Sequence, residues 1–152
     1  MAHSRKYSVD GEQNIASPDD SILGITQTGT VVEPSIFYLA IGCEVAPVDA
    51  TIIWYLQRHT AAGTSTAVTP QNLGPGTAAA SAVGAENHTI EPTFTANAIL
   101  WRLGLNQRAA HSLVFDPEGC PTGPATANNG ITAYPQHASS TVLMSMTMHY
   151  RE

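Results

Sequence analysis

Apolar and polar residues alternate with a period of two in several short segments of this chain. Such alternation places every second side chain on the same face of a β-strand. It predicts strands over 51–59, 98–106 and 141–150. Shorter β-branched and aromatic runs predict further strands over 21–32, 35–43, 88–94, 111–115 and 131–134. We expect seven to nine strands and no long helix.

The alternation also predicts which side chains point into the core. The segment 98–106 is the clearest core strand, and 35–43 reads as a strand buried on both faces. The methionine-rich face of 141–150 is expected to form one wall of the core. The predicted core positions are Ile52, Trp54, Leu56, Ile99, Trp101, Leu103, Leu105, Val142, Met144, Met146, Met148 and Tyr150.

Turn residues separate these strands and define the fold class. Glycine and proline interrupt the apolar runs, and Asn128, Asn129 and Gly130 form a motif that tolerates the positive φ of a tight turn. Regular short strands with such turns predict an all-β, single-domain antiparallel β-sandwich or small barrel. Periodicity does not distinguish consecutive hairpins from Greek-key crossovers.

Two stretches lack the strand pattern. Residues 1–20 mix charges with glycine and proline, which predicts a flexible or extended N-terminal arm outside the core, ahead of a domain over 21–152. Residues 60–88 form a long segment with little patterning, in which 77–85 could make a helical turn or two. Because long loops in small domains are often interaction surfaces, this segment is the main candidate for contacting a partner.

The charge content argues against nucleic acid and anionic membranes as partners. Only 12% of residues are Asp, Glu, Lys or Arg, the net charge is −6, and the six basic residues include one lysine and are scattered. No apolar run approaches the roughly 20 residues that span a bilayer, and the N-terminus carries no evident signal peptide. We expect a chain that is neither secreted by such a signal nor membrane-spanning.

Catalytic and metal-binding motifs are not evident, so we expect no enzyme activity and no cofactor. The nearest approach to a ligand set is Glu86, His88 and Glu91, which keeps a cupin-like metalloenzyme as a weaker alternative. A loop histidine held by local hydrogen bonds is the favoured interpretation of His88. Cys43 and Cys120 show no metal-binding spacing; we expect free thiols, although a disulfide between them is possible.

Four segments taken together resemble one family of proteins. They are 53–70 (IWYLQRHTAAGTSTAVTP), 86–93 (ENHTIEPT), 96–100 (ANAIL) and 106–109 (NQRA). The chain over roughly 34–150 resembles small structural proteins of tailed bacteriophages, and most of all the trimeric jelly-roll cement or decoration proteins of the capsid exterior. The similarity is compositional, and the N-terminal arm lies outside it.

The resemblance implies a jelly-roll homotrimer that binds the major capsid protein on the outer surface of the virion. Such a trimer, made in the bacterial host cytoplasm, would tie capsomers together through several footprints at once. A tail-fibre or receptor-binding head that holds a host glycan is the alternative function. The candidate contact residues are Arg5, Tyr7, Val9, Ile15, Arg58, His59, Leu73, Glu86, His88 and Arg108.

Overall fold

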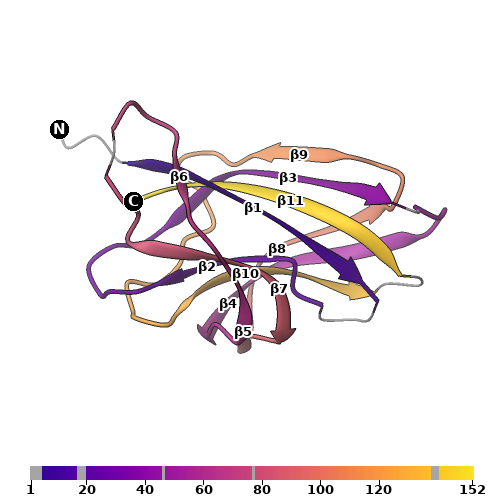
Figure 1. Cartoon of the computed structure of the whole chain (residues 1–152), viewed down its shortest axis with the longest axis horizontal. Coiled ribbons are helices and arrows are strands. Elements are labelled where there is room, and N and C mark those ends of the chain that lie inside the picture. Colours follow the sequence, from indigo (N-terminus) through magenta and orange to yellow (C-terminus); the bar gives the residue numbers. More distant parts are fainter. Residues whose placement is uncertain (1–4, 17–19, 46, 77, 138–140) are drawn as a thin grey trace.

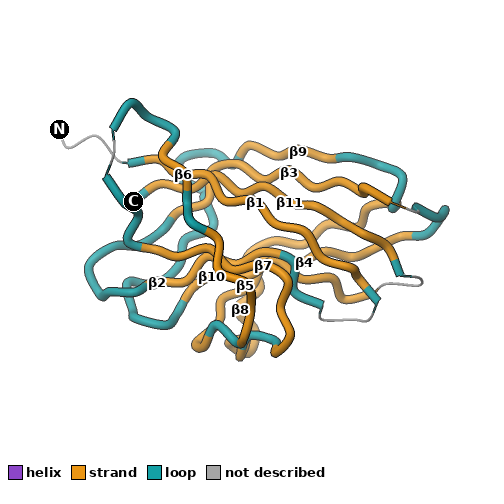
Figure 2. Tube along the Cα trace, in the orientation of Figure 1, coloured by secondary structure: helices purple, strands orange, loops and turns teal. Residues whose placement is uncertain are grey.

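Two antiparallel β-sheets packed face to face form the structure, a computed structural model that describes residues 5–16, 20–45, 47–76, 78–137 and 141–152 (Figures 1 and 2). These residues form eleven strands and no helix, so no membrane-crossing helix occurs among them. The strands are β1 (Lys6–Ile15), β2 (Leu23–Gln27), β3 (Ser35–Val45), β4 (Thr51–Ala61), β5 (Thr64–Val68), β6 (Gln71–Asn72), β7 (Ala82–Ile90), β8 (Thr93–Asn106), β9 (His111–Val114), β10 (Gly130–His137) and β11 (Val142–Arg151). The predicted all-β sandwich is confirmed.

The strands of the two sheets are interleaved along the chain. One sheet has five strands in the order β6-β1-β11-β3-β9, and the other has six in the order β5-β7-β2-β10-β4-β8. No neighbouring pair among these described strands is consecutive in sequence, so the sheets contain no simple β-hairpin. The chain passes from one sheet to the other at most connections, and each sheet is completed only by strands far apart in sequence.

The core lies between the sheets, and β11 supplies its most regular wall. Val142, Met144, Met146, Met148 and Tyr150 are all buried, while the residues between them are half-buried, so the predicted alternation is confirmed. From the six-stranded sheet, β4 contributes Ile52, Trp54 and Leu56, and β2 and β10 contribute further apolar residues, all at most 1% exposed. The predicted inward face of β4 is therefore also confirmed.

The first strand is the largest departure from the sequence-based prediction. Residues 6–15 pair with β11 over ten positions, from Lys6 opposite Arg151 to Ile15 opposite Val142. Tyr7, Val9 and Ile15 are fully buried. The prediction that residues 1–20 form an arm outside the core is therefore wrong for β1. Only Tyr7, Val9 and Ile15 are apolar in this strand, and the inward positions between Val9 and Ile15 are taken by Gly11 and a polar residue, so the alternation is too incomplete to predict a strand.

The strand β8 lies at the edge of the six-stranded sheet and is paired only with β4. Trp101, Leu103 and Leu105 stand opposite the inward-facing residues of β4, so the predicted direction is correct, but all three are only half-buried. A register shift between Leu56 and Gln57 sets Ile99 opposite Gln57 on the outer face, where it is 48% exposed, so the predicted inward direction of Ile99 is wrong. The prediction that 98–106 is a central core strand is wrong, because alternation reports the direction of a side chain and not the presence of a neighbouring strand.

Residues 60–88 are largely ordered into strands rather than forming one long loop. They contain β5, β6 and most of β7, and β7 lies inside the six-stranded sheet between β5 and β2. No helical turn occurs in the described part of 77–85. The sequence also predicts a break at Pro92 in the strand over 88–94 and an edge position for it. The break is confirmed, because Glu91 and Pro92 separate the end of β7 from the start of β8, but only 93–94 lie on an edge strand, since β7 lies inside the sheet. On β3, one face is buried and the other is only half-buried, contrary to the prediction.

Replacement of Tyr7 tests the structural role of β1. The Tyr7 ring lies 5.6 Å from that of Tyr150, and its hydroxyl donates to the carbonyls of Ala78 and Ala79 at 3.2 and 3.1 Å. We expect Tyr7→Ala to lower the free energy of unfolding by about 3–5 kcal/mol in urea titrations. Tyr7→Phe, which keeps the ring, should cost only about 1 kcal/mol. Wild-type stability in the alanine variant would contradict a packed β1.

Candidate functional site

The structure buries half of the residues that the sequence suggested as contacts. Tyr7, Val9 and Ile15 lie in the core, and the exposed fractions of His59 and His88 are 1% and 5%. Their side chains therefore face the protein's own interior rather than a partner. The remaining five candidates are exposed or half-buried: Arg5, Arg58, Leu73, Glu86 and Arg108.

His59 is held inside the six-stranded sheet by two threonines. Its Nε2 lies 3.0 Å from Oγ1 of Thr26 on β2, and its Nδ1 lies 2.9 Å from Oγ1 of Thr132 on β10. Burial, and secondarily the positive charge that His88 can carry, lower the pKa of His59 to about 4. At neutral pH the ring is uncharged and links β2, β10 and its own strand β4. This is a structural histidine.

Close packing around Gly130 fixes the same histidine. A Cβ at Gly130 would lie 1.9 Å from the carbonyl oxygen of Ile25 and 2.7 Å from Cε1 of His59. No side chain fits there without displacing the strand. The adjacent turn has the expected form, since Asn128 has a φ of 67°. The sequence motif at 128–130 therefore combines a positive φ with a site of close backbone approach.

His88, Glu86 and Glu91 are each hydrogen-bonded within the fold. Nδ1 of His88 lies 3.1 Å from the carbonyl oxygen of Ser21, and burial lowers the pKa of His88 although this contact opposes the shift. Glu86 accepts from the backbone N–H of Glu12, and Glu91 accepts from that of Ser21, at 3.0 and 3.1 Å. No group of three or more His, Cys, Asp or Glu side chains in the described chain is placed to hold a metal ion.

An aromatic layer covers the outer face of the six-stranded sheet. Tyr55 and Tyr134 stack with ring centroids 5.5 Å apart, and Phe94 at the start of β8 lies 4.4 Å from Tyr134. The guanidinium of Arg102 sits 5.4 Å from the centre of the Tyr55 ring. Gln57 joins this layer through a 2.7 Å hydrogen bond to the carbonyl of Thr95. The polar face of β4 is thus a second buried layer, which the sequence did not indicate.

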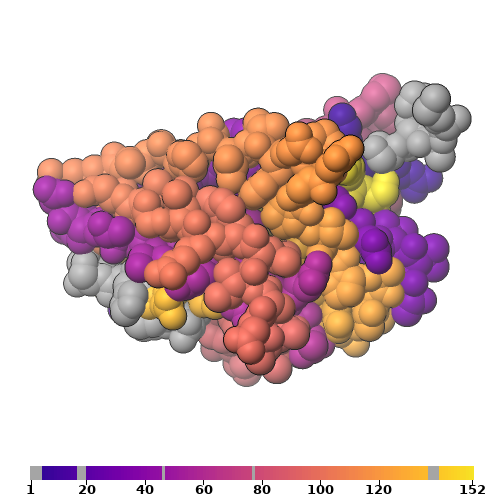
Figure 3. Space-filling model, turned by 180° about the vertical axis from the view of Figure 1, so that it is seen from behind, coloured from indigo at the N-terminus to yellow at the C-terminus, as the bar shows by residue number. Residues whose placement is uncertain are grey.

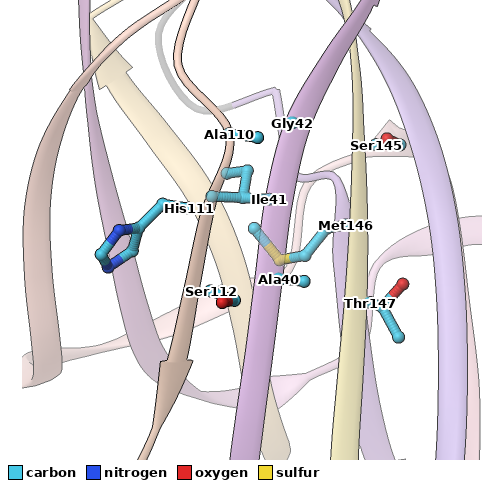
Figure 4. A pocket seen from close by; sticks show the side chains of 9 residues that line it. All are labelled: Ala40, Ile41, Gly42, Ala110, His111, Ser112, Ser145, Met146 and Thr147. Carbon is cyan, nitrogen blue, oxygen red and sulfur yellow. The ribbon is translucent and has the colours of Figure 1, made fainter.

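A hollow of about 340 Å³ lies on the five-stranded sheet, across β9, β3 and β11 (Figure 4). Side chains there are mostly small, and the lining residues are Ala40, Ile41, Gly42, Ala110, His111, Ser112, Ser145, Met146 and Thr147. Ile41 and Met146 belong to the core, so their sequence neighbours point to the opposite, outer face. The His111 ring points away from Ser145 and Thr147 (Figure 4). The hollow therefore contains no paired nucleophile and base.

A second hollow of about 420 Å³ adjoins the first and is acidic. It shares Ser145, Met146 and Thr147 with the first hollow, and its carboxylates are those of Asp10, Glu12, Glu44 and Glu86. Sequence reasoning named only Glu86 of this group. The missed signal was the row of small or acidic residues at the outward positions of β1, β3 and β11, which alternates with the core positions.

The N-terminal end of β1 brings two predicted contact residues together. Arg5 and Leu73 line a hollow of about 440 Å³ with Lys6 and the loop after β6. The backbone N–H of Leu73 donates to the carbonyl of Lys6 at 2.9 Å, and the Leu73 side chain is 47% exposed. The Arg58 side chain is hydrogen-bonded within the fold, because its Nε and Nη2 both donate to the carbonyl oxygen of Thr122. Arg108 lies exposed in the turn after β8.

Comparisons with protein-family models, with curated proteins and with solved structures found no match for this chain. The functional argument therefore rests on the chemistry of the described residues. Two free cysteines, Cys43 and Cys120, are half-buried and each contacts a backbone carbonyl close in sequence. The three hollows described above differ in their linings: small side chains in the first, carboxylates in the second, and Arg5 and Lys6 with the loop after β6 in the third. The side chains of His59 and His88 form hydrogen bonds within the fold.

Acid should destabilise the protein through His59. Its pKa is about 4 in the folded state and about 6.5 when unfolded, so between these values only the unfolded state binds the proton. The contribution of neutral His59 to the free energy of unfolding is therefore fully present above pH 6.5. It decreases by about 3 kcal/mol as the pH falls from 6.5 to 4. His88 adds a loss of the same sign, because its pKa is also lowered. Urea titrations at several pH values between 7 and 4 measure this loss.

The variant His59→Gln isolates the contribution of this one side chain. Glutamine can hydrogen-bond to Thr26 and Thr132 but does not titrate, so the loss of stability between pH 6.5 and 4 should be smaller than in the wild type. All other titrating groups are common to both proteins. Parallel pH dependences in the two proteins would contradict the role given to His59.

Proposed function

We propose that this chain is a structural protein of a larger assembly, in which other protein subunits bind its surface. The observation that carries the proposal is the exposure of eight large aliphatic side chains on a sandwich with little surface charge. They are Val31, Val45, Val48, Leu73, Val83, Ile90, Ile99 and Val114. The eight lie on both sheets and in the connecting loops rather than in one patch, which suits coverage by protein neighbours on several sides and not one docking site.

The finer proposal is a cement protein on the exterior of a phage capsid, bound to the major capsid protein as a homotrimer. It is supported by the resemblance described above and by the β-sandwich, which resists deformation because both sheets share one packed core. Small side chains such as those of Ala40, Gly42 and Ser145 lose little conformational entropy when a partner covers them. The acidic balance of the chain suits a position away from packaged DNA.

A receptor-binding head is the alternative, and one observation favours it. Two residues along β3 and β11 from Ala40 and Thr147 of the first hollow, the rings of Tyr38 and His149 lie on the same outer face with centroids 4.7 Å apart. Small hydroxyl-bearing side chains beside aromatic rings are compatible with a glycan. The two functions differ in the number of copies per particle, because a cement protein covers the lattice and a receptor-binding head occurs only at the tail.

Copy number in purified particles tests the proposal. Quantitative gel densitometry against the major shell protein should give a ratio near one to one, because cement trimers fill repeated positions on the lattice. A handful of copies would contradict the cement function and favour the receptor-binding head. Absence from particles would contradict both. Added protein should also sediment with shells that lack it, and Ala40→Trp with Gly42→Trp should weaken that binding if the small-residue hollow contacts the shell.

A further inference from the structure

One hollow of the surface combines positive charge with apolar walls. It is the hollow of about 440 Å³ between the start of β1 and the loop after β6, and we call it the basic hollow. Leu73, Pro75 and Ala78 form its apolar walls, and Arg5 and Lys6 supply the charge. All of these except Ala78 are exposed. Figure 3 shows the loop after β6, in pink, standing out at one end of the molecule beside the start of β1.

Hydrogen bonds fix the loop that forms the basic hollow. The backbone N–H of Leu73 donates to the carbonyl of Lys6 at 2.9 Å, which ties the loop to β1. The Asn72 side chain accepts from the backbone N–H of Gly74 at 2.8 Å and donates to the carbonyl of Ala78 at 3.5 Å. Because both walls are already in place, binding there would not have to order the loop first.

Two glycines leave the backbone of this loop open. Gly74 and Gly76 both line the hollow, and neither has a φ in the left-handed region. A Cβ at these positions would meet the Asn72 side chain at ordinary contact distances, 3.4 and 3.6 Å. The fold therefore has room for a side chain at both. With glycine there, an extended segment of another molecule can approach the backbone closely.

The positive charges of the hollow are available to an anion. Lys6 stands opposite Arg151 in the pairing of β1 with β11, so three of the chain's six basic residues lie at this end of the sheet. In the described part of the chain, neither Arg5 nor Lys6 forms a salt bridge. The Glu152 carboxylate, beside Arg5, instead accepts from two backbone N–H groups at the start of β7.

We propose that the basic hollow binds a segment of another protein in which carboxylates stand beside apolar side chains. The carboxylates meet Arg5 and Lys6, and an apolar side chain packs against Leu73. A lipid tail fits less well, because such ligands are held in cavities that bury most of their surface and this hollow is lined by exposed residues. The inference deepens the proposed function and rests on it only for the identity of that protein as a shell subunit.

A peptide titration tests the hollow without shells. The probe is a short end-blocked peptide that alternates glutamate and leucine, added to isotope-labelled full-length protein and followed by amide NMR shifts. Shifts should concentrate on the residues that line the hollow and weaken with added salt. Arg5→Gln should raise the dissociation constant about two- to fivefold, and Leu73→Ser at least about threefold. The matched controls, Arg108→Gln and Val31→Ser, alter exposed residues outside the hollow and should leave it unchanged.

Several outcomes would overturn the inference. They are no shifts at the hollow, equal binding of a peptide with lysine in place of glutamate, or equal dissociation constants in the hollow variants and their controls. Tighter binding of octanoate than of the acidic peptide would assign the hollow to a lipid-like anion and would also overturn it. Thermal melting should show that all variants are folded, since each altered side chain is exposed.

Sedimentation with shells separates this inference from the proposed function. A wild type that binds the acidic peptide but no shells would overturn the proposed function alone. A wild type that coats shells but binds no acidic peptide would overturn this inference alone. If both hold, the Arg5 and Leu73 variants should coat shells less well than their controls.

Discussion

The fold depends on the insertion of the last strand between the first and the third. β11 pairs with β1 along ten residues and with β3 along nearly its whole length, and its buried face supplies five core side chains. Tyr7 and Tyr150 pack together where the two ends of the chain meet. Burial raises the pKa of the Tyr150 hydroxyl, with smaller contributions from the nearby Glu152 and Tyr7, so this phenol stays neutral. Without β11 the five-stranded sheet loses its centre and β1 loses its pairing partner.

This constraint explains which parts of the fold were predictable. Alternation identified the inward faces of β4 and β11 because every second residue along most of each strand is a large apolar one. It failed for β1, where Gly11 occupies an inward position that a larger residue could not use, since a Cβ there would lie 2.7 Å from that of Glu86. It also failed to separate a central strand from an edge strand, as β8 shows. Neighbours in these sheets are far apart in sequence, and local patterns carry no information about them.

The candidate sites were less predictable for a related reason. A histidine within a strand has the same local sequence whether it faces a ligand or two threonines of adjacent strands, and only the pairing of β2 and β10 beside β4 decides this for His59. Arg5 and Leu73, both named from the sequence, line one hollow because β1 pairs with β6, a pairing that no local pattern indicates. The first hollow could not be predicted, because alanine, glycine and serine occur on strands of every kind and do not indicate a site.

The core of this protein has an ordinary composition, whereas its surface is unusually poor in charged residues. The core is ordinary in its aliphatic and aromatic packing, but the surface uses threonine, serine and alanine where most domains use lysine and glutamate. The chain's one lysine lies on β1, where its Nζ sits 5.6 Å from the Phe37 ring centre. A low-charge surface gives up the repulsion that keeps molecules apart. Such a surface is a liability for an isolated domain and suits one that is covered by neighbours in an assembly.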